Sequence, residues 1–346
     1  MSDESIHAAL KAHIQPNPAW LAKRVEPIVE PGLEIIDPHH HVWDMSGNRY
    51  LLDELLADFN SGHHIIASVH VQCHSMHRAD GPTEMRCVGE TEFVNGVAAM
   101  SASGAYGPTK VCAGIIGTAD LLLGSRVEQV LQAHINAGGG RFRGIRPSVA
   151  WHESAQVRAL DIPPHILMHK DARKAIACIE RFGLSLDLWC FFTQLDEVLD
   201  VARNFPGLCI IVNHTGGPVG IGPYQGQQEL VFSQWRRNIT ALAGCPNVVI
   251  KIGGLAMRYG GYRFNELAEP PSSDFLVQKW NDYVHAAIDI FGPQRSMFES
   301  NFPVDRGMCN YHVLWNAFKK MSRRYTPSER RCLLSETAAN IYRIEI

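Results

Sequence analysis

The sequence predicts an α/β fold, a (β/α)8 TIM barrel with long loops after its strands and an N-terminal arm. Three observations support this fold class: apolar runs of strand length recur, helix-like segments separate them, and connections after strands are longer than those after helices. We expect the strands within residues 33–43, 64–73, 111–121, 142–151, 184–191, 208–216, 248–256 and 296–305. Residues 1–30 are expected to form the arm and residues 31–346 a single barrel.

The segments between the apolar runs predict that the strands are parallel. Residues 125–138, 171–183, 193–207 and 279–293 have helical character, and the last two end in Pro-Gly or Gly-Pro, a helix stop signal. Strands that alternate with helices form parallel βαβ units, and this number of repeats favours a closed barrel over an open doubly wound sheet. No GxGxxG motif follows the first run, which argues against a bound dinucleotide.

Three long segments follow predicted strands, at residues 74–110, 152–170 and 257–275. In a TIM barrel these loops lie at the C-terminal face, where active sites are built. The pattern therefore locates a functional site at that face before any motif is considered.

The composition indicates a globular protein and excludes several functional classes. Hydrophobic residues make up 46% of the 346 residues and charged residues 19%, which suits a large core. The net charge is −3 without a basic block, so we expect a small-molecule substrate and no nucleic acid. Nine cysteines without a CxxC motif, no apolar signal region and no long apolar run favour a reduced, cytoplasmic location without membrane contact.

The strongest local signal is the run Asp37-Pro38-His39-His40-His41 at the end of the first predicted strand. Side chains two residues apart on a strand share a face, so His39 and His41 point together and His40 points away. Two imidazoles at the barrel mouth suit a divalent metal such as zinc or the polarisation of a carbonyl. We expect His40 to make a structural contact behind the barrel.

Two further signals lie on later strands. His214 ends the sixth predicted strand, directly before a glycine-rich turn, and completes a candidate set of metal ligands with His39 and His41. Glu299 and Asn301 share a face near the end of the eighth predicted strand, whereas Asp305 lies beyond it and could cap the next helix. A buried Glu299 would need a partner, for which Arg146 or Lys251 is available.

Other polar residues inside the apolar strands predict a substrate-binding network, because buried polar groups need partners. Arg146 could hold a substrate carboxylate with two hydrogen bonds, or could pair with Asp187 or Glu299. We include Gln72, Asp187 and Trp189 as candidate binding residues. Glu90, in the loop after the second strand, is expected on a helix surface.

Together these segments resemble the amidohydrolase superfamily, and within it the amidohydrolase 2 family of TIM-barrel hydrolases. The resemblance runs from about Leu33 to Tyr342 and is carried by IIDPHHHVWD, VQC, GETEF, FRGIRP, LDLWC, VNHTGGP and MFESNFPVD. Family members include sugar-acid lactonases and the 2-pyrone-4,6-dicarboxylate lactonase, and relatives are often oligomeric. The resemblance implies that His39, His41 and His214 form the site and that Arg146 contacts the substrate.

The sequence departs from the family at position 301. The family usually has Ser-Asp-Trp-Pro on its eighth strand, where the aspartate accepts a proton from the attacking water and binds metal; here the residue is Asn301. An amide cannot act as a general base near neutral pH. Either Glu299, Asp305 or His214 is then the base, or the histidines alone hold a metal that acidifies water, or hydrolysis proceeds without metal. Asn301 favours the metal-free alternative.

The sequence and the resemblance together predict hydrolysis of an ester-like bond, in particular that of a lactone. One alternative is the non-oxidative decarboxylation of an aromatic or dienoic acid on the same barrel. A second alternative, which Asn301 favours, is a barrel that binds a small molecule without catalysis.

Overall fold

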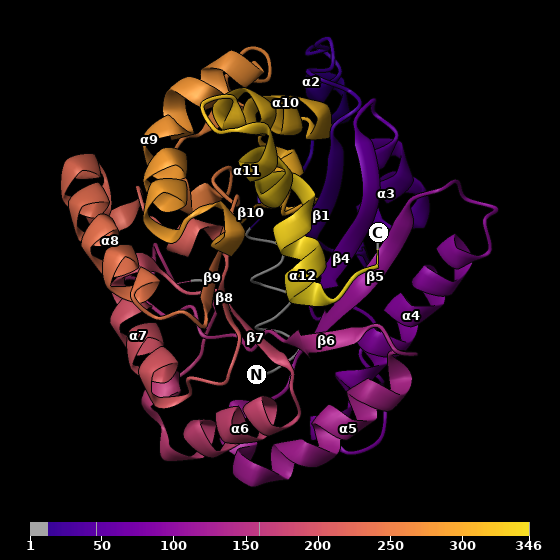
Figure 1. The fold of residues 1–346 in the computed structure, drawn as a ribbon, viewed down its shortest axis with the longest axis vertical. Coiled ribbons are helices and arrows are strands. Elements are labelled where there is room, and N and C mark those ends of the chain that lie inside the picture. Colours follow the sequence, from indigo (N-terminus) through magenta and orange to yellow (C-terminus); the bar gives the residue numbers. More distant parts are fainter. Residues whose placement is uncertain (1–12, 46, 159, 346) are drawn as a thin grey trace.

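The computed structural model describes residues 13–45, 47–158 and 160–345. Eight parallel strands form one sheet in the order β1-β4-β5-β6-β7-β8-β9-β10, and helices surround it (Figure 1). The sheet closes between its first and last strands: the Asn301 backbone N–H donates to the His39 carbonyl (2.9 Å), and the His41 N–H donates to the Phe302 carbonyl (2.8 Å). The predicted (β/α)8 barrel is confirmed.

Each observed barrel strand lies within or overlaps a predicted range. They are β1 (Glu34–His40), β4 (His64–Val71), β5 (Lys110–Gly117), β6 (Phe142–Ile145), β7 (Ser185–Leu188), β8 (Ile210–Val212), β9 (Val248–Ile252) and β10 (Ser296–Phe298). Most strands end earlier than expected. A short hairpin, β2 (Trp43–Met45) and β3 (Asn48–Tyr50), was not predicted.

The helices occupy the positions that βαβ connections require. They are α2 (Pro18–Leu21), α3 (Leu52–Phe59), α4 (Val88–Ala102), α5 (Val127–Ala137), α6 (Lys170–Arg181), α7 (Leu195–Asn204), α8 (Gln228–Ala243), α9 (Ser273–Phe291), α10 (Tyr311–Ser322), α11 (Pro327–Arg331) and α12 (Thr337–Tyr342). No helix in the described part of the chain is long and apolar enough to cross a membrane.

Two apolar cores hold the barrel together. The larger one lies between strands and helices, and the smaller one joins Ile36, Val69, Ile116, Ile211 and Val249 from strands around the ring. Since these residues contact each other from several sides, they fill the interior of the barrel, as in other small barrels.

The C-terminal segment covers the end of the barrel opposite the expected site. In Figure 1, α12 lies across the near end of the barrel, and Tyr342 packs in the interior core. The Tyr342 hydroxyl donates to Asp187 Oδ2 (2.9 Å). This contact anchors Asp187 from below, and the opposite mouth is left for the functional loops.

Candidate active site

The structure brings the three predicted histidines together at the mouth of the barrel. His39 and His41 come from the end of β1, and His214 follows β8. The ring centroid of His39 lies 5.0 Å from that of His41 and 4.5 Å from that of His214. All three side chains are buried. Burial lowers the pKa of each imidazole, and nearby cationic groups lower it further, so the three rings are neutral near pH 7.

Glu299 joins two of these histidines. Its Oε1 accepts hydrogen bonds from the backbone N–H and from Nδ1 of His214, both at 2.8 Å. Its Oε2 lies 2.7 Å from Nδ1 of His39. Because Nδ1 of His214 donates to the carboxylate, its Nε2 carries a lone pair. Arg146 and Lys251, the partners expected for Glu299, are not the ones it uses; both expectations were wrong.

The backbone around His214 is unusual and depends on two glycines. His214 and Asn301 have φ values of 53° and 56°, in the left-handed region that costs non-glycine residues stability. A Cβ atom on Gly254 would lie 2.5 Å from Nδ1 of His214, and one on Gly253 would lie 2.5 Å from Cγ of Glu299. The Gly253-Gly254 pair therefore leaves room for the His214–Glu299 contact.

His41 belongs to a separate chain of contacts. Its Nδ1 donates to the Val71 carbonyl (2.7 Å), and its Nε2 lies 3.3 Å from Oδ1 of Asn301. The Asn301 amide donates to Oδ1 of Asp305 (2.8 Å), and Oδ2 of Asp305 accepts from the Ala256 backbone (3.2 Å). Burial raises the pKa of Asp305 well above its usual value, which favours its neutral form.

Asp187 and Lys251 lie beneath this site rather than in it. Lys251 Nζ donates to Asp187 Oδ2 (2.9 Å), and both side chains are fully buried. The Asn213 amide also donates to this oxygen (3.0 Å). Asp187, a candidate binding residue in the sequence, is thus enclosed by protein partners. His40 also lies outside the site, with Nε2 2.9 Å from the Ser68 hydroxyl.

A cavity opens above the histidines. Arg146, Gln72 and Trp189 line it together with His41 and His214. In the described part of the chain, Arg146 forms no ion pair and its Nε has no hydrogen-bond partner, although a second guanidinium nitrogen donates to the Gln72 carbonyl. Arg146 therefore keeps a buried N–H without a partner and lines the same cavity as His41 and His214.

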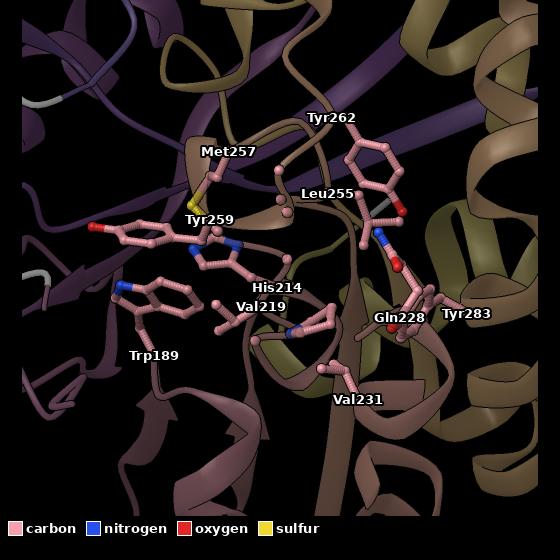
Figure 2. A pocket seen from close by; sticks show the side chains of 16 residues that line it. Trp189, His214, Val219, Gln228, Val231, Leu255, Met257, Tyr259, Tyr262 and Tyr283 are labelled. Carbon is pink, nitrogen blue, oxygen red and sulfur yellow. The ribbon is translucent and has the colours of Figure 1, made fainter. Parts of the chain in front are cut away.

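Aromatic side chains form one wall around His214. Figure 2 shows Trp189, Tyr259 and Met257 gathered about the His214 imidazole. The ring centroid of Trp189 lies 4.9 Å from that of His214 and 5.8 Å from that of Tyr259. An apolar wall of this kind excludes water and favours the neutral form of the imidazole.

Glu90 is buried, so the expectation that it lies on a helix surface was wrong. Its Oε1 accepts from the Cys73 backbone N–H (2.7 Å) and lies 3.3 Å from Nε2 of His70. Although burial raises its pKa, contacts with His70, His77 and the Cys73 N–H keep the pKa well below the usual value. Glu90 fixes α4 to the end of β4, next to the cavity.

The site residues fit a divalent metal ion. Ligand atoms of His39, His214 and Glu299 lie within 4.8 Å of one another, and two imidazoles with one carboxylate form a donor set that zinc accepts. His39 Nε2 is buried and has no hydrogen-bond partner among the described residues. The sequence predicts His41 as the third ligand beside His39 and His214; in the structure Glu299 takes that place.

The structure also adds cavity residues that sequence reasoning missed. They are His13, His74, Met257, Tyr259 and Val304. Tyr259 and Met257 belong to the long loop after β9, so the loop length was a usable signal for them. His13 lies outside the barrel segment, and no local pattern marked it.

A TIM barrel with buried imidazoles and a carboxylate at its C-terminal rim defines a class of hydrolytic enzymes. The chain belongs to the amidohydrolase family, whose model matches residues 36–344.

Two individual proteins are similar over most of the chain. The protein y4mH of Sinorhizobium fredii is 33% identical over 90% of this chain and 99% of its own length. An L-fucono-1,5-lactonase of Burkholderia multivorans is 26% identical over 66% of this chain and 71% of its own length.

Two solved structures share the fold. A Burkholderia multivorans amidohydrolase with bound zinc has a TM-score of 0.69 at 24% identity and covers 90% of this chain and 99% of its own. A protein of Pseudomonas putida named as a 2-pyrone-4,6-dicarboxylic acid hydrolase has a TM-score of 0.58 at 17% identity, with coverage of 91% and 99%. At these identities the two structures show the fold alone.

Proposed function

We propose that the protein hydrolyses a lactone, with His214 as general base. Glu299 orients the His214 imidazole and stabilises its protonated form. The observation that carries this proposal is the pair of 2.8 Å hydrogen bonds from His214 to one Glu299 oxygen. These bonds leave Nε2 of a neutral imidazole free to accept a proton beside the cavity. Relatives named L-fucono-1,5-lactonase and L-rhamnono-gamma-lactonase support the lactone as substrate class.

The reaction can be written with residues of this chain. The lactone carbonyl oxygen lies against Arg146, whose free N–H donates to it and stabilises the negative charge that develops. Water attacks the carbonyl carbon and gives its proton to Nε2 of His214. The ring C–O bond then breaks, and the leaving oxygen takes the proton from His214, which yields a hydroxy acid.

Glu299 stabilises the positive charge on His214 between the two steps. The carboxylate oxygen accepts from Nδ1 throughout, so the imidazolium forms beside a fixed negative group. Trp189 and Tyr259 keep bulk water from this pair. A metal would replace this proton transfer rather than assist it: His39, His214 and Glu299 would hold a divalent ion, which would polarise the carbonyl and acidify a water molecule while His214 no longer served as base.

We propose the cytoplasm as the location and a small molecule as the partner of the site. All nine cysteines are free thiols and most are buried, which fits a reducing compartment.

A lactone panel tests the proposed function. Purified protein is offered sugar-acid 1,4- and 1,5-lactones and pyrone carboxylates, and acid release is followed with a pH indicator. Turnover that is lost in His214→Ala supports lactone hydrolysis by this site. Release of carbon dioxide from aromatic acids would indicate decarboxylation instead. Ligand binding without turnover, unchanged by His39→Ala and His214→Ala, would indicate a binding protein.

A further inference from the structure

The N-terminal arm reaches the catalytic cavity, although it precedes the segment that the family model matches. The match begins at residue 36, whereas the side chain of His13 lines the cavity together with His41, Arg146 and His214. A residue outside the common barrel therefore shares a wall with the predicted catalytic groups.

Gly307 leaves the space in which this part of the arm packs. A Cβ atom on Gly307 would lie 2.2 Å from the Ile14 carbonyl oxygen, so only glycine allows the arm to lie this close. Gly307 does not itself have a positive φ, so alanine there would change the contact and not the local conformation. On the other side, the Asn48 amide donates to Oε1 of Gln15 (3.0 Å).

The arm is held at further points along its length. The Trp20 indole donates to the Leu267 carbonyl (2.8 Å), in the long loop after β9. The Asn310 amide, at the start of α10, donates to the Leu21 (3.0 Å) and Arg24 (3.2 Å) carbonyls. In Figure 1, α2 lies beside α10. The described part of the arm therefore contacts two segments of the C-terminal face, and its first residue, His13, lies at the cavity.

The residues around His13 determine its protonation state. Burial, and to a smaller extent the charges of Arg258, Arg146 and His214, lower its pKa to about 4. A neutral imidazole offers one N–H donor and one acceptor nitrogen. This pair of groups matches a hydroxyl, which also donates and accepts.

We propose that His13 is a substrate-binding residue, whose imidazole hydrogen-bonds a hydroxyl group on the side of the lactone that faces out of the barrel. This inference rests on the proposed function. It makes the arm a specificity element of this chain and names hydroxylated lactones, of the sugar-acid type, as the substrate class.

Three variants test the inference by two routes. His13→Ala removes the imidazole, and Gly307→Ala displaces the arm while His13 is kept. Each should raise KM for a hydroxylated lactone about tenfold with kcat little changed, the effect of one lost hydrogen bond between neutral groups. The double variant should resemble either single variant, because both remove the same contact. His64→Ala, at an exposed position at the start of β4, is the matched control.

Two comparisons sharpen the result. KM for an unsubstituted lactone, such as δ-valerolactone, should be the same in wild type and His13→Ala, because it has no hydroxyl to bind. Carbethoxylation of histidines, mapped by mass spectrometry, should modify His13 faster in Gly307→Ala than in wild type, while the rate at His64 stays constant.

The outcomes separate the two proposals. If wild type opens hydroxylated lactones and His13→Ala does so with unchanged KM, the role of His13 is overturned and lactone hydrolysis stands. The same holds if KM rises in Gly307→Ala although His13 reacts equally fast in wild type and Gly307→Ala, because the rise in KM would then not act through His13. If wild type opens no lactone while amide substrates or decarboxylation give turnover, the proposed function fails and the inference fails with it.

Discussion

Replacing Glu299 by glutamine tests the proposed base most directly. The Glu299→Gln side chain has nearly the same shape, and its amide oxygen can still accept both hydrogen bonds from His214. What changes is the charge of the acceptor. We expect kcat on the best lactone of the panel to fall about a hundredfold, with little change in KM.

The magnitude follows from the contact that strengthens during the reaction. The backbone N–H bond to Glu299 is the same before and during proton transfer, whereas the Nδ1 bond, at 2.8 Å, comes to join an imidazolium to a carboxylate. Loss of the charge of the acceptor weakens that bond by roughly 1.5–3 kcal/mol, and each 1.36 kcal/mol is about tenfold in rate. The pH dependence of kcat gives a second readout: the negative charge of Glu299 raises the pKa of His214, so the acid limb should move to lower pH in the variant.

Asp305→Asn is the matched control, because it also replaces a buried carboxyl group by an amide. Asn301 can rotate its own amide, so that its oxygen accepts from the new residue and its nitrogen donates to His41. The backbone N–H of Ala256 keeps an acceptor, and kcat should stay within roughly threefold of wild type. Equal, small losses in Glu299→Gln and Asp305→Asn, or an acid limb that does not move, would remove Glu299 and His214 from the mechanism.

Three other predictions concern the room around the base, the buried histidines and the metal. Gly254→Ala should lower kcat about a hundredfold, because the added Cβ displaces the His214 ring. Gly226 also has a positive φ, of 76°, but has open space around it, so Gly226→Ala should lower only the free energy of unfolding, by roughly 1 kcal/mol. Kinetics and urea unfolding of both variants check this. Burial lowers the pKa of His134 to about 4, so between pH 6.5 and 4 the unfolded chain binds more protons than the folded one, and the free energy of unfolding should fall as the pH falls. At pH 5 this residue alone should cost about 2 kcal/mol. Urea unfolding at several pH values checks this, and the same dependence of the free energy of unfolding on pH in His134→Gln and wild type would contradict it. With His214 as the base, dialysis against dipicolinate should leave turnover unchanged at substoichiometric metal. A loss of about tenfold or more that zinc restores, with less zinc bound by His39→Ala in elemental analysis, would instead favour a metal held by His39, His214 and Glu299.

The sequence predicted the features of this site that depend on local periodicity. Alternation along a strand places His39 and His41 on the same side, and the glycine-rich turn after β8 marks His214 as the end of a strand. Because carboxyl ends of parallel strands meet at one face, the three histidines were expected together, and their ring centroids lie within 5.0 Å of a neighbour.

The contacts of the carboxylates could not be predicted in this way. Glu299 pairs with His214, 85 residues away, since the register of β8, β9 and β10 brings their ends together. Glu90 lies on α4, where helix character alone does not say which side faces β4. His13 reaches the cavity because Gly307 leaves space for Ile14, a contact between segments far apart in the sequence. Partner choice of this kind depends on tertiary packing, which a single sequence does not reveal.

The substitution at position 301 is consistent with an active enzyme once these contacts are considered. The family aspartate is replaced by Asn301, but a carboxyl group, Asp305, lies directly behind the amide and accepts its hydrogen bond at 2.8 Å. Burial favours the neutral form of Asp305, so this pair has little capacity to accept a proton. In the proposed mechanism proton transfer then falls to His214, whose imidazole Nδ1–H and backbone N–H both donate to Glu299. A barrel that only bound ligand would have no need to keep this pair, or the positive φ of His214 and the glycines that make room for it.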